Sequence, residues 1–335
     1  MPRVPTDAVL LERGVFLDLE TVDDDDLDRG RLTRSLPSWD WHARSASDQI
    51  ATRISRADVV ISNRCELNRQ ALAAARGLRL IALAATGTDK VDLVAARELG
   101  ITVCNIRNYC SESVAQHVIA LMLNLLTRQP DYIRSIQAGK WTDHRQFSLR
   151  GVPIREAKGL NFGVIGYGAL GQAAADSARR LGMDILVAER KGRSPRRGRV
   201  EFEEVLARSD VLSVHCPLNA GTRDLVTRAE ISSMKADAIL INTARGGIVN
   251  EADLADCLRE GVIAGAGVDT LSEEPPPANH PLLAPDIPNL LLTPHNAWAS
   301  RSSRQAAIDQ LADIIRAFAD GKPFNQVTVA SGKPA

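Results

Sequence analysis

The sequence predicts an α/β fold with parallel sheets in two domains, and three observations lead to this prediction. The chain has 335 residues, enough for about two domains of roughly 100 to 200 residues each. From Ala57 onward, short β-branched or aliphatic runs alternate with helical stretches rich in Ala, Leu and Arg, as strands and crossover helices do in a parallel sheet. The alternation restarts after a polar segment around Trp141. We therefore expect a second unit of the same kind.

The first unit is expected to contain a strand at 58–62, a helix at 67–76 and strands at 78–83 and 101–104. A long helix then begins near Ser111 or Glu112 and runs to about Thr127. The run of four aspartates at 23–26 most simply predicts a solvated loop.

The second unit is expected to contain strands at 160–165, 184–188, 211–215, 238–242, 265–269 and 290–293, with helices between them. The stretch 302–319 reads as an amphipathic helix, because its apolar residues recur at spacings of three and four. This helix follows the last strand of the second unit, so we expect it to fold back on the first. The first domain would then be discontinuous, 1–106 plus 299–335, around an inner domain of 107–298.

Composition excludes several classes of function. The charges balance, 41 Lys and Arg against 41 Asp and Glu, so the cationic field that nucleic-acid binding needs is absent. The longest apolar run, 118–126, is too short to span a bilayer, and no membrane segment is expected. The five cysteines form no Cys-x-x-Cys pair, which predicts reduced thiols and no metal site. The N-terminus does not resemble a signal peptide, and a cytoplasmic protein is expected.

A glycine motif at 166–171 predicts a dinucleotide site. It consists of Gly166, Tyr167, Gly168, Ala169, Leu170 and Gly171. The motif alone is weak, but here it follows a predicted strand and opens a helix, so its backbone N–H groups could bind a pyrophosphate. Glu189 ends the next predicted strand, where a carboxylate would accept hydrogen bonds from both ribose hydroxyls. The alternative is a structural glycine turn.

The choice between NAD and NADP depends on neighbouring charges. Glu189 would repel a 2′-phosphate and favours NAD. Arg190, Lys191 and Arg193 follow directly and could pair with that phosphate, so NADP stays possible. These basic residues could equally form a solvated loop.

Three further polar residues stand at the ends of apolar strands. Arg245, Glu274 and His295 follow three successive predicted strands, and in an open parallel sheet the carboxyl ends of the strands surround the ligand crevice. Taken singly, they could be a surface arginine, a loop carboxylate and a hydrogen-bonded loop histidine. Together, after a nucleotide motif, they supply what carbonyl reduction requires.

Hydride transfer to a carbonyl carbon makes an alkoxide, and a proton must neutralise it. His295 is the natural proton donor near neutral pH. Glu274 beside it would favour the imidazolium form and fix the orientation of the ring. The guanidinium of Arg245 can hold a substrate carboxylate while it polarises the adjacent carbonyl. This set predicts an oxidoreductase acting on a small 2-oxo acid.

Several linked motifs resemble those of the D-isomer-specific 2-hydroxyacid dehydrogenase family. They are the glycine motif at 166–171, His-Cys-Pro-Leu at 215–218, Asn-Thr-Ala-Arg-Gly-Gly at 242–247, Gly-Val-Asp at 267–269 with Glu274-Pro275, and Thr-Pro-His at 293–295. The resemblance implies two Rossmann-like domains, one flavodoxin-like and one binding NAD, with parallel sheets and a cleft between them. It also implies that Arg245, Glu274 and His295 are the catalytic set.

The same resemblance assigns further contacts. Asp269 would contact the nicotinamide carboxamide, Cys216 and Pro217 would line the cofactor, and the turn at 85–89 would bind the substrate carboxylate. The implied cofactor contacts also include Tyr167, Ala169, Leu170, Arg190, His215, Thr222, Thr243, Ala244 and His295. The implied substrate contacts are Arg64, Thr86, Gly87, Arg245 and His295.

Two segments, 107–117 and 294–300, resemble the hydroxypyruvate reductase or glycerate dehydrogenase branch. They imply NAD(P)H-dependent reduction of hydroxypyruvate or glyoxylate to D-glycerate or glycolate. One alternative is a dehydrogenase for another 2-hydroxy acid, such as phosphoglycerate. The other is a non-catalytic NAD-sensing binding protein, against which the complete Arg, Glu and His set counts.

Members of the family are commonly homodimers, joined by the long helix and arm after the first domain, here about 111–147. Trp141 in this arm could be a buried anchor or could reach the active site of the partner. It could equally pack on its own subunit.

Overall fold

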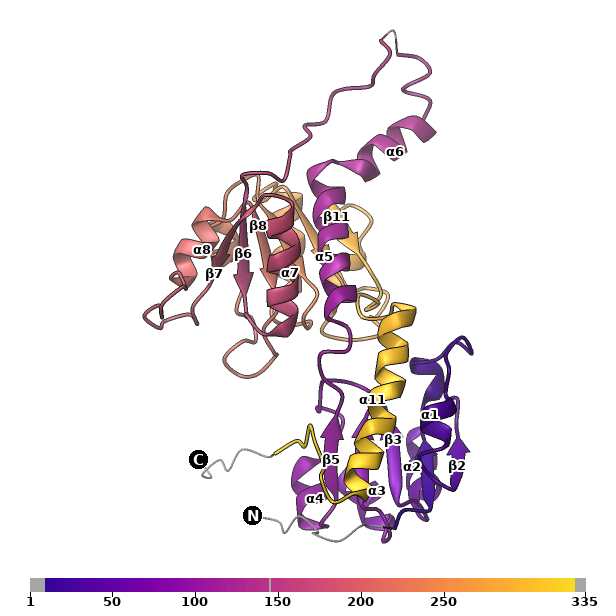
Figure 1. Ribbon diagram of the computed structural model, residues 1–335. Coiled ribbons are helices and arrows are strands. Elements are labelled where there is room, and N and C mark those ends of the chain that lie inside the picture. The colour runs from indigo at the N-terminus through magenta and orange to yellow at the C-terminus, as the bar shows by residue number, and fades with distance from the viewer. Residues whose placement is uncertain (1–9, 145, 329–335) are drawn as a thin grey trace. The chain divides into compact units, whose positions relative to one another are not determined.

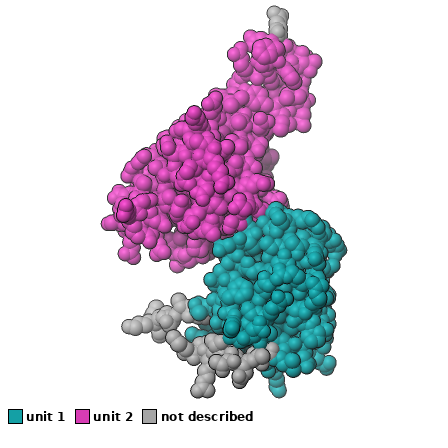
Figure 2. Space-filling model, viewed as in Figure 1, with its two compact units in different colours: residues 1–110, 299–335 teal, residues 111–298 magenta. Residues whose placement is uncertain are grey.

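The computed structural model describes residues 10–144 and 146–328 (Figure 1). The chain divides into two compact units: unit 1 comprises 1–110 and 299–335, and unit 2 comprises 111–298 (Figure 2). The sequence placed the first boundary after residue 106. The backbone of Arg107 explains the difference, because its N–H donates to the Gln310 amide oxygen and its carbonyl accepts from the Gln310 amide nitrogen. These two bonds hold residue 107 on unit 1.

Unit 1 is built on a parallel sheet with the strand order β2-β1-β3-β4-β5. The strands are β1 (Arg13–Phe16), β2 (Ser38–Trp41), β3 (Val59–Ser62), β4 (Leu80–Leu83) and β5 (Thr102–Asn105). This order is that of flavodoxin-like folds, as the predicted fold class implies. The predicted alternation began at Ala57 and did not include β1, which begins with an arginine and a glycine, or β2, which mixes two tryptophans with a serine and an aspartate. Neither strand is the β-branched or aliphatic run by which the other strands were predicted.

The helices of unit 1 are α1 (Gly30–Thr33), α2 (Ser47–Ile54), α3 (Arg69–Ala74), α4 (Leu93–Glu98) and α11 (Arg301–Ala319), with a 3₁₀ turn at Leu19–Thr21. The predicted amphipathic face of α11 is confirmed. Its apolar side chains, among them Ile308, Leu311 and Ile315, are buried in one core with Phe16 of β1 and Ile61 of β3. The last long helix is therefore an integral part of the first sheet domain.

The aspartate run at 23–26 is only partly solvated, so the prediction of a solvated loop was wrong for two of its residues. Asp23 is buried and accepts hydrogen bonds from the N–H groups of residues 26 and 27. Asp26 forms a two-pronged ion pair with Arg304 of α11, at 2.7 and 2.9 Å. The Arg304 guanidinium holds the pKa of Asp26 below its usual value. This pair ties the N-terminal segment to α11.

Unit 2 contains a second parallel sheet, with the order β11-β10-β9-β8-β6-β7. Its strands are β6 (Asn161–Ile165), β7 (Asp184–Val187), β8 (Val211–Val214), β9 (Ile239–Asn242), β10 (Gly265–Val268) and β11 (Leu290–Leu292). All six predicted strands are confirmed. A parallel bridge between Ala188 and Val200 continues the sheet beyond β7, which gives the strand order of a doubly wound dinucleotide-binding fold.

Helices α5 (Ser111–Leu126), α6 (Gln129–Gln137), α7 (Ala169–Arg180), α8 (Phe202–Arg208), α9 (Arg228–Ser232) and α10 (Glu251–Arg259) belong to unit 2, with a 3₁₀ turn at Pro281–Leu283. Helix α5 packs on β9, β10 and α7. A Cβ on Gly267 of β10 would lie 3.0 Å from Leu121 of α5, so the glycine permits this close approach. In Figure 1, α6 and the segment after it extend away from the rest of unit 2.

No helix in the described ranges is long and apolar enough to cross a membrane. Residues 10–144 and 146–328 also contain no group of three or more His, Cys, Asp or Glu side chains arranged to hold a metal ion. All five cysteines are free thiols, and four of them are buried.

Candidate active site

The turn between β6 and α7 forms a cradle that only glycine can build. Gly166 has φ +91°, and a Cβ there would lie 2.6 Å from the backbone nitrogen of Cys216. A Cβ on Gly171 would lie 2.1 Å from the Gly166 carbonyl oxygen. Gly168 is the N-cap residue of α7, and the space where a Cβ would stand is open. The N–H groups of the first turn of α7, with Tyr167, Ala169 and Leu170 beside them, can therefore bind a diphosphate.

Buried polar atoms without partners mark the carboxyl ends of three adjacent strands. They are His215 Nδ1 after β8, Thr243 Oγ1 after β9 and Thr270 Oγ1 after β10, and none has a hydrogen-bond partner among the described residues. Burial lowers the pKa of His215 to about 4, so its ring is neutral. Because buried polar groups are normally hydrogen-bonded, these atoms fit a site that a bound dinucleotide completes.

Glu189 follows β7, and its carboxylate is already engaged. The side chain of Arg196 binds it through two nitrogens at 2.6 and 2.8 Å, and the N–H of Arg190 donates to it at 2.9 Å. Arg196, and then the Arg190 N–H, lower the pKa of Glu189 to about 2. Lys191, a predicted phosphate partner, instead pairs with Glu230. Arg190, Lys191 and Arg193 were predicted as possible phosphate partners, but Arg196 was not, because spacing does not tell which of these side chains folds back.

The loop after β8 contains three further predicted cofactor contacts, Cys216, Pro217 and Thr222. Cys216 is half-buried, and burial raises the pKa of its thiol to about 11, so it stays protonated. The Thr222 hydroxyl donates to the Pro217 carbonyl at 2.6 Å and accepts from the Asn219 N–H at 2.8 Å. Thr222 therefore shapes the loop that presents Cys216 and Pro217.

His295 and Glu274 form the predicted pair. Nδ1 of His295 lies 2.7 Å from Oε2 of Glu274, and both side chains are mostly buried. His295 has φ +52°, a left-handed conformation that is strained for a histidine and clusters at functional sites. Its N–H donates to the Asp269 carbonyl at 2.8 Å, and its carbonyl accepts from the Trp298 indole at 3.1 Å. These contacts hold the ring, whose Nε2 has no hydrogen-bond partner among the described residues.

Arg245 follows β9 in a turn fixed by Asn242. The Asn242 amide donates to the Arg245 carbonyl at 2.9 Å and accepts from the Ala244 N–H at 3.1 Å. The Arg245 guanidinium donates to the Ala244 carbonyl at 2.8 Å. Within the described part of the chain no carboxylate pairs with it, so it is available to an anionic ligand.

Asp269, directly after β10, is a predicted cofactor contact whose carboxylate is also engaged by its own chain. It is only 2% exposed and accepts from Thr293 Oγ1 at 2.6 Å and from the N–H groups of Asn296 and Ala297. His117 of α5, which the sequence analysis did not single out, lies 3.0 Å from Thr293 Oγ1 through its Nε2. Its sequence signals are its place at the end of the 107–117 segment, which resembles the hydroxypyruvate reductase branch, and the apolar helical stretch that follows it.

The predicted substrate contacts outside unit 2 follow the carboxyl ends of two neighbouring strands of unit 1, β3 and β4. Arg64 follows β3, where its N–H donates to the buried Asp18 carboxylate at 2.6 Å. Thr86 and Gly87 follow β4, the neighbour of β3, and the Thr86 hydroxyl donates to the Ile106 carbonyl at 3.1 Å. That these residues approach His295 stays a prediction.

A family model, two relatives of known name and a solved structure all resemble this chain. A family model described as D-isomer specific 2-hydroxyacid dehydrogenase, NAD binding domain, matches residues 119–297. Glycerate dehydrogenase of Methylorubrum extorquens is 42% identical over 280 residues, which cover 84% of this chain and 88% of that protein. Hydroxypyruvate reductase of Blautia hydrogenotrophica is 34% identical over 284 residues, covering 84% and 88%. The crystal structure of the TT0316 protein from Thermus thermophilus superposes with a TM-score of 0.82 at 31% identity, covering 94% of this chain and 100% of that one.

Proposed function

Because the chain belongs to the D-isomer-specific 2-hydroxyacid dehydrogenases, we propose that it reduces hydroxypyruvate or glyoxylate with NAD(P)H to D-glycerate or glycolate. The observation that carries the proposal is the Glu274–His295 pair, in the same unit as an arginine without a carboxylate partner among the described residues. The substrate choice is supported by the relatives named glycerate dehydrogenase and hydroxypyruvate reductase.

Each member of the set has a distinct task in the reduction. The bound cofactor supplies the hydride. Arg245 binds the substrate carboxylate and polarises the carbonyl next to it. Glu274 holds His295 through Nδ1, which leaves Nε2 to give its proton to the oxygen as charge develops there. In the reverse reaction the same Nε2 takes the proton from the hydroxyl. Arg64, Thr86 and Gly87 are proposed as further substrate contacts.

The proposal is tested by the loss of reduced-nicotinamide absorbance with hydroxypyruvate, glyoxylate, pyruvate and phosphohydroxypyruvate in turn. The proposal predicts the highest kcat/KM with hydroxypyruvate or glyoxylate. A preference for phosphohydroxypyruvate would instead support the phosphoglycerate alternative. Tight NADH binding without turnover of any 2-oxo acid would support the NAD-sensing alternative.

The Glu189–Arg196 pair is proposed to set the balance between NADH and NADPH. Glu189 disfavours a 2′-phosphate, and Arg196 neutralises part of that repulsion. Arg196→Ala should therefore raise the ratio of kcat/KM for NADH over NADPH by about two- to fivefold, because a solvent-exposed charge pair is screened and contributes little. Arg197→Ala removes a neighbouring exposed arginine and serves as the control. A ratio that is unchanged or lower in Arg196→Ala would refute this role.

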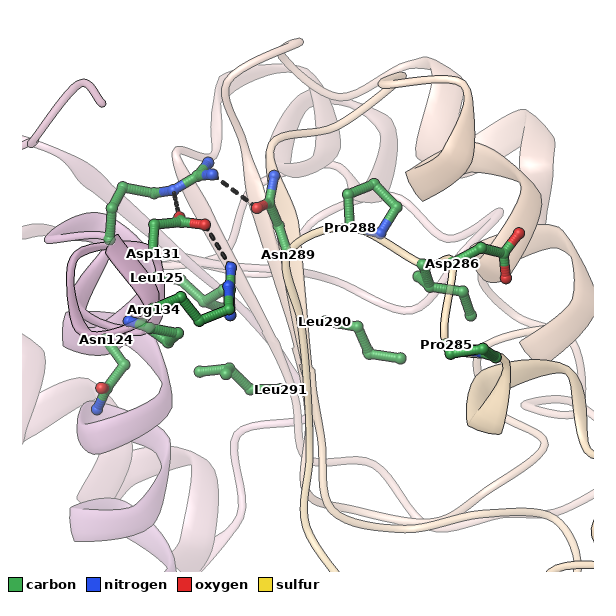
Figure 3. A pocket seen from close by; sticks show the side chains of 13 residues that line it. Asn124, Leu125, Asp131, Arg134, Pro285, Asp286, Pro288, Asn289, Leu290 and Leu291 are labelled. Atoms are coloured by element: carbon green, nitrogen blue, oxygen red, sulfur yellow. Dashed lines mark hydrogen bonds and ion pairs between the residues drawn. The ribbon is translucent and has the colours of Figure 1, made fainter. Parts of the chain in front are cut away.

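We propose that a second copy of the chain covers the arm after α5. Four large apolar side chains are exposed there, by 49 to 95%: Ile133, Ile136, Trp141 and Phe147. The Trp141 indole N–H donates to the Phe147 carbonyl at 3.1 Å but leaves about half of the side chain exposed. Apolar side chains gathered in this way are typical of interfaces. A cavity of about 590 Å³ lies next to the arm, between α5, α6 and the loop before β11 (Figure 3).

Charging the arm is expected to separate the dimer. The double variant Ile136→Glu, Phe147→Asp should have the mass of a monomer by light scattering, because both side chains are exposed in the single chain and their loss does not affect the core. Leu99→Glu, at an exposed apolar residue of unit 1, is the control and should stay dimeric. A dimeric arm variant, or a monomeric wild type, would reject this interface.

A cytoplasmic location is also proposed. Its support is that all five cysteines are free, as is usual for proteins of reducing compartments.

A further inference from the structure

The carboxylate of Glu251, the first residue of α10, connects two loops of unit 2. Its Oε1 accepts from the N–H of Ser272 at 2.7 Å and more weakly from that of Gly247 at 3.4 Å. Its Oε2 accepts from the Ser272 hydroxyl at 2.6 Å. Gly247 belongs to the loop of Arg245, and Ser272 belongs to the loop of Glu274. Glu251 thus contacts both the loop that contains Arg245 and the loop that contains Glu274. It takes no part in the reaction described above.

The buried His280 also contacts this carboxylate. Nε2 of His280 lies 2.8 Å from Oε2 of Glu251, and Nδ1 of His280 accepts from the Leu282 N–H at 3.2 Å. Because Nδ1 accepts, it carries no proton, and Nε2 must be the protonated nitrogen that donates to Glu251. Every group that contacts the carboxylate is therefore a donor, and neither side chain is more than about one-ninth exposed.

The two loops also meet through their backbones. A Cβ on Gly246 would lie 1.9 Å from the carbonyl carbon of Leu271 and 2.0 Å from the nitrogen of Ser272. The N–H of Leu271 in turn donates to Oε1 of Glu274 at 3.0 Å. A shift of one loop against the other would therefore change the position of Arg245 relative to Glu274.

We propose that Glu251 is a positioning residue for the reduction, whose carboxylate fixes the separation between the loops of Arg245 and Glu274. The inference rests on the proposed roles of these two residues. While the hydrogen bonds of Glu251 are intact, Arg245, which holds the substrate carboxylate, stays at a constant distance from Glu274, which orients the proton donor. A displacement of about 1 Å at such groups costs on the order of 10²-fold in rate.

Glu251→Gln tests this positioning role with a side chain of the same size. In either orientation its NH₂ group meets a donor, the N–H groups of Ser272 and Gly247 on one side or Nε2–H of His280 on the other. We expect kcat/KM for the 2-oxo acid to fall about 10- to 100-fold, with NADH affinity measured by fluorescence unchanged. Glu251→Asp keeps the acceptors and should recover part of the loss. Adding Ser272→Ala to Glu251→Gln should cost nothing further, because both act through one contact.

Leu258→Ala is the matched control, because it removes a buried side chain of the same helix that faces the core rather than the two loops. It should lower Tm while leaving kcat unchanged well below Tm. The role of Glu251 is overturned if Glu251→Gln keeps wild-type kcat/KM, or loses no more activity than Leu258→Ala at an equal drop in Tm. A wild-type protein that reduces no 2-oxo acid would instead overturn the proposed function on which this role rests.

Discussion

Replacing His295 by asparagine is expected to lower kcat for 2-oxo acid reduction by about 10²- to 10⁴-fold, the usual contribution of a general acid. The variant keeps no group at the position of Nε2 that can deliver a proton. Asparagine is chosen because it tolerates the left-handed backbone that His295 adopts at φ +52°. Steady-state oxidation of NADH at saturating substrate measures the effect.

The same variant should bind NADH nearly as the wild type does, because the glycine turn and Glu189 follow two other strands of the sheet, β6 and β7. Fluorescence titration of NADH provides this control. If His295→Asn retains kcat near that of the wild type, then His295 is not the proton donor.

Arg245→Lys is expected to lower kcat/KM for the 2-oxo acid by about 10²- to 10³-fold, with KM raised and kcat lowered together. Lysine keeps the positive charge but lacks the two parallel donors that bind a carboxylate while polarising the neighbouring carbonyl. The KM for NADH should not change. The turn itself should persist, since Asn242 holds it through the backbone atoms of Ala244 and Arg245.

Arg259→Lys is a suitable comparison, because Arg259 is an arginine of the same unit whose partners, Asp256 and Asp286, lie in α10 and the loop before β11. It should have wild-type kinetics. An Arg245→Lys variant that raised the KM for NADH and spared the 2-oxo acid would assign the guanidinium to the cofactor instead.

The regular part of the fold could be predicted because its signals are local. Strands such as β8 and β9 are buried apolar runs bounded by turn residues, and α11 shows a helical period over five turns of chain. Strands β1 and β2 were missed because neither is an apolar run: β1 begins with an arginine and a glycine, and β2 mixes two tryptophans with a serine and an aspartate. Ion pairs such as Asp26–Arg304 join residues far apart in the sequence, so no local pattern indicates them.

The candidate site also contains residues that could be predicted from the sequence and contacts that could not. Arg245, Glu274 and His295 could be named because each lies in the loop after an apolar strand, and the contact between Glu274 and His295 is present as predicted. The partners that hold them were not predictable. Arg196 is one of several similar arginines, and only the folded loop shows that it binds Glu189. Glu251 begins a helix and reads as an ordinary acidic first-turn residue until Ser272 is placed beside it.

Hydride transfer to the carbonyl carbon is tested most directly with NADH deuterated at C4 of the nicotinamide, on the face that the enzyme uses, and hydroxypyruvate as substrate. The product should be D-glycerate with one deuterium at C2, and His295→Asn should abolish its rapid formation while leaving cofactor binding intact. L-glycerate, a racemic product, or D-glycerate without deuterium would contradict the assignment of this chain as a hydride-transferring D-2-hydroxyacid dehydrogenase.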